Sequence, residues 1–263
     1  MTASAQAKAS VSVVLVHGGF LGPWSWADVA AKLTENAITT VVPELPSMGD
    51  PQERALGDFY ADAAAVRNVL DELDYPVLLC GHSYGGAVVT EAAGGPHPSV
   101  AHLVYLTAAV LDAGESMASF GPGGDAEPTS AASDPDAART RRGPERPAEG
   151  PVPGPAGTIV LEPDQAAAAL FNDCTEERAR QGSSSLRPMN PAVGAQPLTR
   201  AAWRDIAATF VRGSQDRMPE IVTPAFFDRR PEVITLPAGH CPNWSRPDLV
   251  AELLMGQAEK IAT

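Results

Sequence analysis

Residues 77–86 read Val-Leu-Leu-Cys-Gly-His-Ser-Tyr-Gly-Gly, and the alanine- and valine-rich residues 87–92 follow them. The apolar run at the start has the composition of a strand buried on both faces, and the stretch at the end is typical of a helix. Gly81, Ser83 and Gly85 form the pattern G-x-S-x-G on the turn between the two. Glycines on either side of the serine let neighbouring backbone approach closely, so the strained turn pushes the hydroxyl of Ser83 into a cleft.

A serine hydroxyl needs a base before it can attack at neutral pH, and that base is commonly a histidine held in one tautomer by a carboxylate. His240 follows a predicted strand through one short loop, and Asp216 follows the preceding predicted strand in the same way. The order serine, acid, histidine strengthens a pattern that alone would arise by chance in roughly one chain in ten of this length. Asp112 also follows a strand and is the alternative acid. We therefore expect Ser83, His240 and Asp216 to form a catalytic triad.

Attack by Ser83 on a carbonyl would create an oxyanion, and each main-chain N–H group that binds it contributes about 3 kcal/mol to stabilisation of the transition state. Tyr84, directly after the serine, is placed to supply one such group. The loop after the first predicted strand is the expected source of the second, and within it we favour Gly19, with Phe20 as its neighbour. The sequence thus predicts an oxyanion hole formed by the N–H groups of Gly19 and Tyr84.

Six short, β-branched apolar runs predict six strands, at residues 11–16, 38–42, 77–80, 103–106, 209–212 and 233–236. Helical patterns lie between and after them, at 23–36, 55–73 and 245–261. The last of these places Leu249, Leu253 and Ile261 on one face. Alternation of strand and helix predicts an α/β fold, a mostly parallel six-stranded sheet with helices on both faces, whose functional sites lie beyond the carboxyl ends of the strands.

The alternation stops after the fourth predicted strand and resumes only before the fifth, a gap far longer than an ordinary connection. We therefore expect residues 1–111 and 198–263 to form the core and residues 112–197 to form an inserted cap. Within the cap, residues 112–157 are dominated by small residues and proline, so we expect them to be mobile. Residues 158–197 carry helix-start signals, so we expect them to be helical.

The chain has 263 residues, enough for one α/β domain with a substantial core. Its 19 Lys and Arg against 32 Asp and Glu give a formal net charge of -13, opposite in sign to what nucleic acids and anionic membranes attract. No apolar run approaches the roughly 18 residues of a membrane span, and the first ten residues are polar and alanine-rich. We expect a cytoplasmic monomer or homodimer that binds a small-molecule substrate and neither nucleic acid nor a membrane.

No cofactor and no metal site is predicted. The glycines within 18–22 lack the G-x-G-x-x-G spacing of a dinucleotide-binding loop, and the histidines are not spaced as metal ligands. We expect His17 and His82 to bond neighbouring loops and Cys241 to be a small packing residue. Aromatic residues belong to the core by default, but four apolar side chains near the predicted site are candidates for a substrate pocket: Phe20, Trp24, Leu170 and Phe171.

These motifs occur in the order found in the α/β-hydrolase fold, which the chain resembles over nearly all of its length outside residues 112–197. The segments that carry the resemblance are His17-Gly18-Gly19, the turn at 81–85, Gly213-Ser214-Gln215-Asp216 and Gly239-His240. The stretch from His17 to Trp26 is similar to that of the compact plant methylesterase and hydroxynitrile lyase group and of small bacterial esterases. The resemblance implies hydrolysis of a small carboxylic ester, such as a methyl ester of an aromatic or polyketide-like acid.

Other functions fit the same site. The lyases of that group carry a threonine where this chain has Gly18 and a lysine where it has Cys241, and this departure favours ester hydrolysis. A lyase or a carbon–carbon bond hydrolase using the same serine, histidine and aspartate is one alternative. A ligand-binding protein without turnover is the other.

Overall fold

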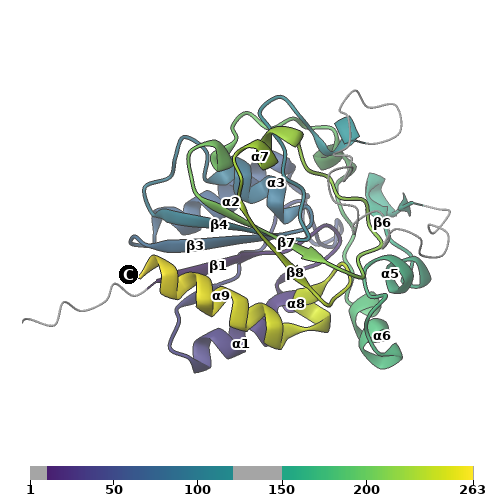
Figure 1. The fold of residues 1–263 in the computed structure, drawn as a ribbon. Helices are drawn as coiled ribbons and strands as arrows, with labels where there is room; N and C mark the ends of the chain where they lie inside the picture. The colour runs from purple at the N-terminus through teal and green to yellow at the C-terminus, as the bar shows by residue number, and fades with distance from the viewer. Residues whose placement is uncertain (1–10, 121–149, 263) are drawn as a thin grey trace, which may run out of the picture.

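A computed structural model describes residues 11–120 and 150–262. Six parallel strands form one sheet in the order β2-β1-β3-β4-β7-β8 (Figure 1). The strands are β1 (Ser12–Val16), β2 (Thr40–Val41), β3 (Val77–His82), β4 (Val100–Leu106), β7 (Ala208–Gly213) and β8 (Glu232–Leu236). All six predicted strands are confirmed, and so is the α/β-hydrolase arrangement of the sheet.

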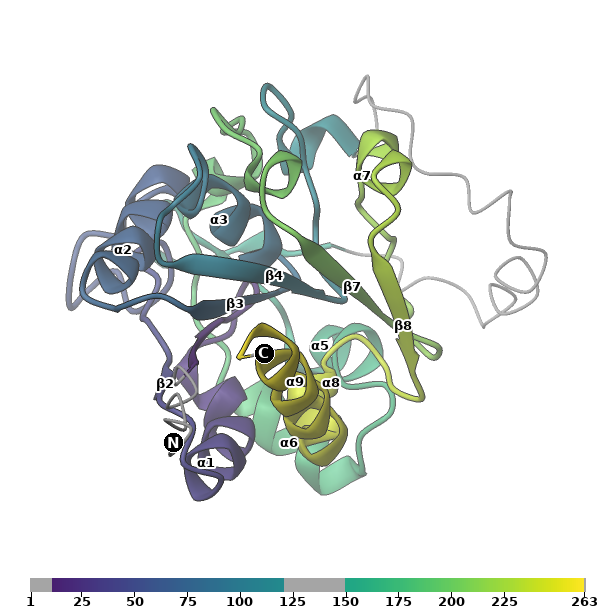
Figure 2. The ribbon, with the colours of Figure 1, turned by 60° about the vertical axis from the view of Figure 1, so that its left-hand side comes forward.

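Helices cover both faces of this sheet (Figures 1 and 2). On one face lie α2 (Phe59–Asp71), α3 (Gly85–Ala92) and α7 (Pro224–Asp228). On the other lie α1 (Ala27–Glu35), preceded by the 3-10 turn η1 (Pro23–Trp26), with α8 (Pro242–Ser245) and α9 (Pro247–Ile261). Two apolar cores result, one on each side of the strands.

The strands are apolar on both faces because both faces are covered. In β1, Val14 and Val16 belong to the core beneath α2 and α3, whereas Val13 and Leu15 belong to the core beneath α1 and α9. All four side chains are fully buried, since successive residues of a strand point to opposite faces. This is why the run at the N-terminal strand shows no alternation of apolar and polar residues.

Two helical predictions need correction. The helix expected from Ala55 begins at Phe59, because the extended backbone of Asp58 ends the preceding loop and its carboxylate accepts a hydrogen bond from the N–H of Ala61 at 2.9 Å. In α9 the predicted line of Leu249, Leu253 and Ile261 is only half-buried and flanks the core. The fully packed line contains Val250, Ala251, Leu254 and Ala258, because α9 is rotated about its axis relative to the predicted face.

Residues 112–197, here called the inserted segment, lie between the neighbouring strands β4 and β7. Its described elements are η2 (Met117–Phe120), β5 (Val152–Pro153), η3 (Pro155–Gly157), β6 (Ile159–Val160), α5 (Pro163–Ala169), α6 (Glu176–Ser184) and η4 (Pro191–Gly194). The short turn η5 (Ala202–Arg204) then leads into β7. Figure 1 shows α5 and α6 together at one end of the sheet. Of the stretch expected to be mobile, residues 121–149 lie outside the described residues.

None of the helices in residues 11–120 and 150–262 combines the length and the apolar character needed to cross a lipid bilayer.

The N-cap of α2 gives a test of the helix boundary. We expect Asp58→Ala to lower the free energy of unfolding by about 1 to 2 kcal/mol, because the N–H of Ala61 and the side-chain amide of Gln196 both lose their acceptor. Urea denaturation measures the change. The matched control is Glu72→Ala at the opposite end of the same helix, where an exposed acidic side chain caps nothing. Equal losses in the two variants would contradict the capping role of Asp58.

Candidate active site

Ser83 occupies a tight turn between β3 and α3 and has a positive φ of 51°. The turn fits only because its neighbours are small. A Cβ atom on Gly81 would lie 2.5 Å from the carbonyl oxygen of Gly85, and one on Gly85 would lie 2.7 Å from the carbonyl oxygen of His17. The glycines therefore let the serine turn seat against the loop that follows β1. This is the local geometry expected of the G-x-S-x-G pattern.

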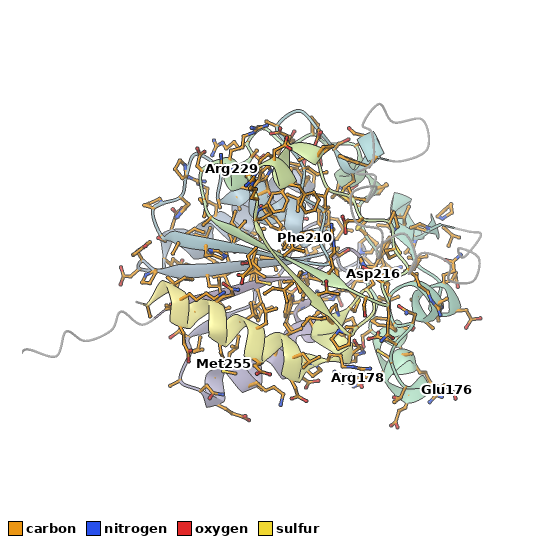
Figure 3. All side chains as sticks on the ribbon, viewed as in Figure 1. Glu176, Arg178, Phe210, Asp216, Arg229 and Met255 are labelled. Carbon is orange, nitrogen blue, oxygen red and sulfur yellow. The ribbon has the colours of Figure 1, made fainter. Side chains whose placement is uncertain are left out.

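The structure brings Ser83, His240 and Asp216 into one hydrogen-bonded row. His240 Nε2 lies 3.0 Å from Ser83 Oγ, and His240 Nδ1 lies 2.9 and 3.1 Å from the two carboxylate oxygens of Asp216. Because a carboxylate only accepts, Nδ1 carries the hydrogen, and Nε2 of the neutral ring is left to accept from the serine hydroxyl. The N–H of Met218 donates to Asp216 at 2.8 Å and fixes the carboxylate. Figure 3 places Asp216 at the end of the sheet that faces α5.

The alternative acid, Asp112, does not reach this row. Its carboxylate accepts a hydrogen bond from Arg204 Nε at 2.9 Å and also pairs with the terminal nitrogen of the same guanidinium. This pairing holds the pKa of Asp112 below its ordinary value. Of the two candidate acids, the structure brings only Asp216 to His240.

The main-chain carbonyl of His240 is held by two side chains from neighbouring strands. His82 Nε2–H, at the end of β3, and Thr107 Oγ–H, just after β4, both donate to it at 2.8 Å. His82 is fully buried, and burial, together with the nearby His240, lowers its pKa from 6.5 to about 3. His82 is therefore a neutral donor that bonds two loops, the position expected for it from the sequence.

His17 is the second buried histidine of this region. Its Nδ1–H donates to the carbonyl of Gly18 at 3.0 Å, and burial lowers its pKa from 6.5 to about 4. It therefore stays neutral at physiological pH, close to the loop that carries the predicted oxyanion donor.

The N–H groups of Gly19 and Tyr84 lie in adjacent loops. A Cβ atom on Gly19 would be 3.8 Å from the Cβ of Tyr84. Within the described residues, the N–H groups of Gly19, Phe20 and Tyr84 donate to no other protein group. The carbonyl of Phe20 accepts from the N–H of Arg187 at 2.8 Å, which anchors the loop. Donors left free beside a serine nucleophile have the arrangement that an oxyanion requires.

A carboxylate that the sequence motifs did not single out is buried beneath Tyr84. Asp62 of α2 is fully buried and accepts three hydrogen bonds, from Ser47 N–H at 2.8 Å, Ser47 Oγ–H at 2.5 Å and the Tyr84 hydroxyl at 2.7 Å. Burial raises its pKa above the ordinary value, opposed by these hydrogen bonds. The signal was present, because Asp62 lies on the same face of α2 as Phe59 and Val66. It fixes the side chain of the residue whose N–H is a predicted oxyanion donor.

Three of the four predicted pocket residues lie together in one apolar cluster. Trp24, Leu170 and Phe171 belong to a buried apolar cluster between the inserted segment and the core, with Leu21, Ala166, Ala179, Cys241 and Trp244. In this cluster the rings of Trp24 and Trp244 meet edge to face at 5.0 Å. Phe20 is half-buried in the loop after β1. Of two surface cavities, of about 480 and 600 Å³, neither is lined by Ser83, and the smaller is lined in part by Trp244 of this cluster.

Met189, which the sequence did not single out, covers the loop of Gly19. Its sulfur would lie 3.3 Å from a Cβ atom on Gly19, and its backbone forms bridges to Met48 and Ile159. A single methionine in a stretch of proline and asparagine shows no periodicity that would reveal this position. Met189 is therefore the side chain of the inserted segment that the structure places beside a predicted oxyanion donor.

Cys241, next to His240, is fully buried in the same apolar cluster as Trp24. Burial raises the pKa of its thiol well above the ordinary value, and the nearby Asp216 adds to this effect. The thiol is therefore protonated and inaccessible, as expected of a packing residue.

The model of the alpha/beta hydrolase family matches residues 13–253, so this chain belongs to the alpha/beta hydrolase family. The resemblance stated from the motifs is thereby confirmed.

Relatives of this chain include hydrolases and esterases. The chain is 26% identical to the alpha/beta hydrolase nvfD of Aspergillus novofumigatus, over 94% of this chain and 96% of that protein. It is 36% identical over 114 residues, 41% of this chain and 46% of the relative, to a carbendazim hydrolyzing esterase of Nocardioides sp.. Among solved structures, the methylesterase MES16 of Arabidopsis superimposes with a TM-score of 0.69 at 18% identity, covering 95% of this chain and 99% of that one. These relatives support an enzyme of the alpha/beta hydrolase type.

The buried neutral state of His82 predicts a dependence of stability on pH. Between pH 6.5 and about 3 the unfolded chain binds a proton at His82 that the folded chain does not, so the free energy of unfolding falls as the pH falls. We expect His82→Gln, whose amide can still donate to His240, to reduce this slope by about one proton, or about 1.4 kcal/mol per pH unit.

Urea denaturation at several values between about pH 4.5 and 6 measures this slope. The pKa of His17 is lowered in the same direction in both proteins. The slopes of the free energy of unfolding against pH should therefore differ between wild type and variant by the contribution of His82 alone. Parallel curves for wild type and His82→Gln would show that His82 is not buried in its neutral form.

Proposed function

We propose that this protein is a serine hydrolase that cleaves a small carboxylic ester through an acyl-enzyme on Ser83. The single observation that supports this best is the row of hydrogen bonds from Asp216 through His240 to Ser83. His240 Nδ1 lies 2.9 Å from Asp216 Oδ2, and His240 Nε2 lies 3.0 Å from Ser83 Oγ. The free N–H groups of Gly19 and Tyr84 complete the set of groups that acyl transfer requires.

In the proposed reaction Ser83 Oγ forms a bond to the ester carbonyl carbon while its proton passes to His240 Nε2. The carbonyl electrons move onto the oxygen, and Gly19 and Tyr84 donate to this oxyanion. The intermediate then expels the alcohol, which takes the proton from His240. Water repeats the attack with His240 as base, and the carboxylic acid leaves. Asp216 orients the imidazole and stabilises its protonated form throughout.

Two details oppose the lyase alternative. A Cβ atom at Gly18 would lie 2.9 Å from the Cβ of Ser83, so this backbone has no room for the threonine of the lyases. Cys241 is neutral, apolar and buried, so it offers no cation to a leaving anion. Both positions support ester chemistry rather than cyanohydrin cleavage.

For the substrate we propose a small ester with an apolar acyl group, such as a methyl ester of an aromatic or polyketide-like acid. The support is the esterase and methylesterase names among the relatives and the apolar side chains of Met189 and Phe20 beside Gly19. We further propose that residues 112–197 act as the cap over this site. No cofactor enters the proposed reaction.

Hydrolysis of p-nitrophenyl acetate and of aromatic methyl esters tests the proposal. We expect Ser83→Ala to lose at least about a thousandfold in kcat/KM, because no nucleophile remains. The control is Ser184→Ala on the exposed side of α6, which should hydrolyse the esters like wild type. Equal background rates in wild type and Ser83→Ala would reject the esterase and favour a lyase or a binding protein.

The two candidate acids can be separated by one pair of variants. We expect Asp216→Asn to lower kcat by about ten-thousandfold, because an amide that donates to His240 favours the wrong tautomer. Asp112→Asn should keep kcat within about twofold, since its carboxylate pairs with Arg204 instead. Steady-state kinetics on the same ester measures both. A larger loss in Asp112→Asn than in Asp216→Asn would assign the acid to Asp112.

A further inference from the structure

The link between α5 and α6 touches both loops that carry the proposed acid and base. Asn172 Nδ2–H donates to the carbonyl of Gln215, the residue before Asp216, at 2.9 Å. Asn172 Oδ1 and Asp173 Oδ1 each lie 2.6 Å from the position of a Cβ atom on Gly239, the residue before His240. We call Asn172 and Asp173 the clamp. One dipeptide of the inserted segment thus contacts the chain immediately before both members of the acid–base pair.

The two loops also contact each other beneath the clamp. The N–H of Gln215 donates to the carbonyl of Ala238, and the N–H of Ser214 donates to that of Leu236, both at 2.9 Å. The carbonyl of Gln215 is therefore the point where the acid loop accepts from the inserted segment, while its N–H is bonded to the base loop. A shift of Asn172 would be transmitted to both loops through this one residue, whose carbonyl and N–H belong to successive peptide groups.

The clamp is held on its other side by the segment that follows His240. Asp173 Oδ2 accepts from Ser245 Oγ–H of α8 at 2.7 Å. Arg178 of α6 donates to the carbonyl of Trp244 at 3.1 and 3.2 Å, and Trp244 Nε1–H donates back to the carbonyl of Arg178 at 3.1 Å. The guanidinium also stacks on the Trp244 ring and pairs with Asp28 of α1. The clamp therefore joins a rigid contact between α6 and α8.

Hydrogen bonds within the protein do not satisfy every polar atom of the clamp. Among the described residues, Asn172 Oδ1 and Asp173 Oδ1 are buried without a hydrogen-bond partner. A buried acceptor without a protein partner destabilises the folded state, so a side chain that carries one is a candidate for a role other than packing. Asn172 meets that description at the place where it could affect the geometry of Asp216 and His240.

We propose that Asn172 is a positioning residue that aligns the Asp216–His240 pair through the carbonyl of Gln215. The inserted segment then acts on the acid–base pair as well as covering the site. This proposal rests on the proposed function for its kinetic consequence, but the alignment of Asp216 with His240 can be observed without turnover.

The test uses two substitutions at one position. Asn172→Ala removes the donor to Gln215, and we expect kcat for ester hydrolysis to fall about tenfold with KM within about twofold. Asn172→Asp nearly keeps the volume but sets a carboxylate against the Gln215 carbonyl, so we expect it to lower kcat further than alanine does. If the side chain served packing only, aspartate would be the milder substitution.

The matched control is another carboxamide that joins the inserted segment to the core. Gln196 accepts from the N–H of Phe59 and donates to Asp58, both at 2.9 Å, and neither partner belongs to the acid loop or the base loop. We expect Gln196→Ala to lower the melting temperature about as much as Asn172→Ala while leaving kcat within about twofold. A loss of kcat in Gln196→Ala equal to that in Asn172→Ala would overturn the proposal, because any loosening of the segment would then suffice.

A second measurement separates this proposal from the proposed function. Nitrogen and proton NMR of His240 reports the Nδ1–H bonded to Asp216 whether or not any ester is hydrolysed. We expect this resonance to be sharp in wild type and Gln196→Ala, and broadened by exchange with water in Asn172→Ala. An unchanged resonance in Asn172→Ala would reject the positioning role. Absence of turnover in wild type would reject the esterase, and the NMR comparison would still decide the role of Asn172.

Discussion

The main-chain carbonyl of His240 is the point on which the arrangement of the site depends. Two donors from neighbouring strands, His82 and Thr107, converge on this one oxygen at 2.8 Å. They hold the base loop against the ends of β3 and β4, and Ser83 follows His82 directly in the chain. The distance between Ser83 and the imidazole is thus set by rigid strands rather than by the flexibility of a loop. Burial keeps His82 in the neutral form, with a pKa of about 3, so this bond persists over the physiological pH range.

Charge is distributed sparingly around the serine. Two of the imidazoles near it, His17 and His82, are buried and neutral at physiological pH. The carboxylate of Asp62 is buried beneath Tyr84, where three hydrogen bonds replace the water it has lost. Hydrogen bonds between buried groups such as these are stronger than hydrogen bonds exposed to water, because the local dielectric constant is low.

The sequence predicted the elements that depend on local pattern. Apolar runs located all six strands, and the order of the motifs led to Ser83, Asp216 and His240, which the structure brings together. The start of α2 was placed too early, because helical periodicity extends into the loop before its cap. What the sequence did not predict are contacts between distant segments. Asn172 meets Gln215 across 43 positions, and no spacing rule connects them. Trp24 and Phe171, predicted to line a pocket, lie in an apolar cluster between the inserted segment and the core, and sequence alone does not distinguish the two settings because aromatic side chains look alike in a core and in a cavity.

The inserted segment leaves the sheet from β4 and returns to β7, and these two strands pair directly with each other. The sheet fixes both ends of a long connection between adjacent strands, whatever the length of that connection. The entropic cost of closing such a loop grows by only about 0.6 kcal/mol for each doubling of its length. Evolution can therefore lengthen, shorten or replace most of this excursion without disturbing the serine turn beneath it. The contacts of Asn172 and Asp173 impose a limit on that freedom. A relative with a different inserted segment must either keep comparable contacts to the acid and base loops or stabilise these loops by other means. New substrate specificities should therefore arise most readily from changes elsewhere in the segment.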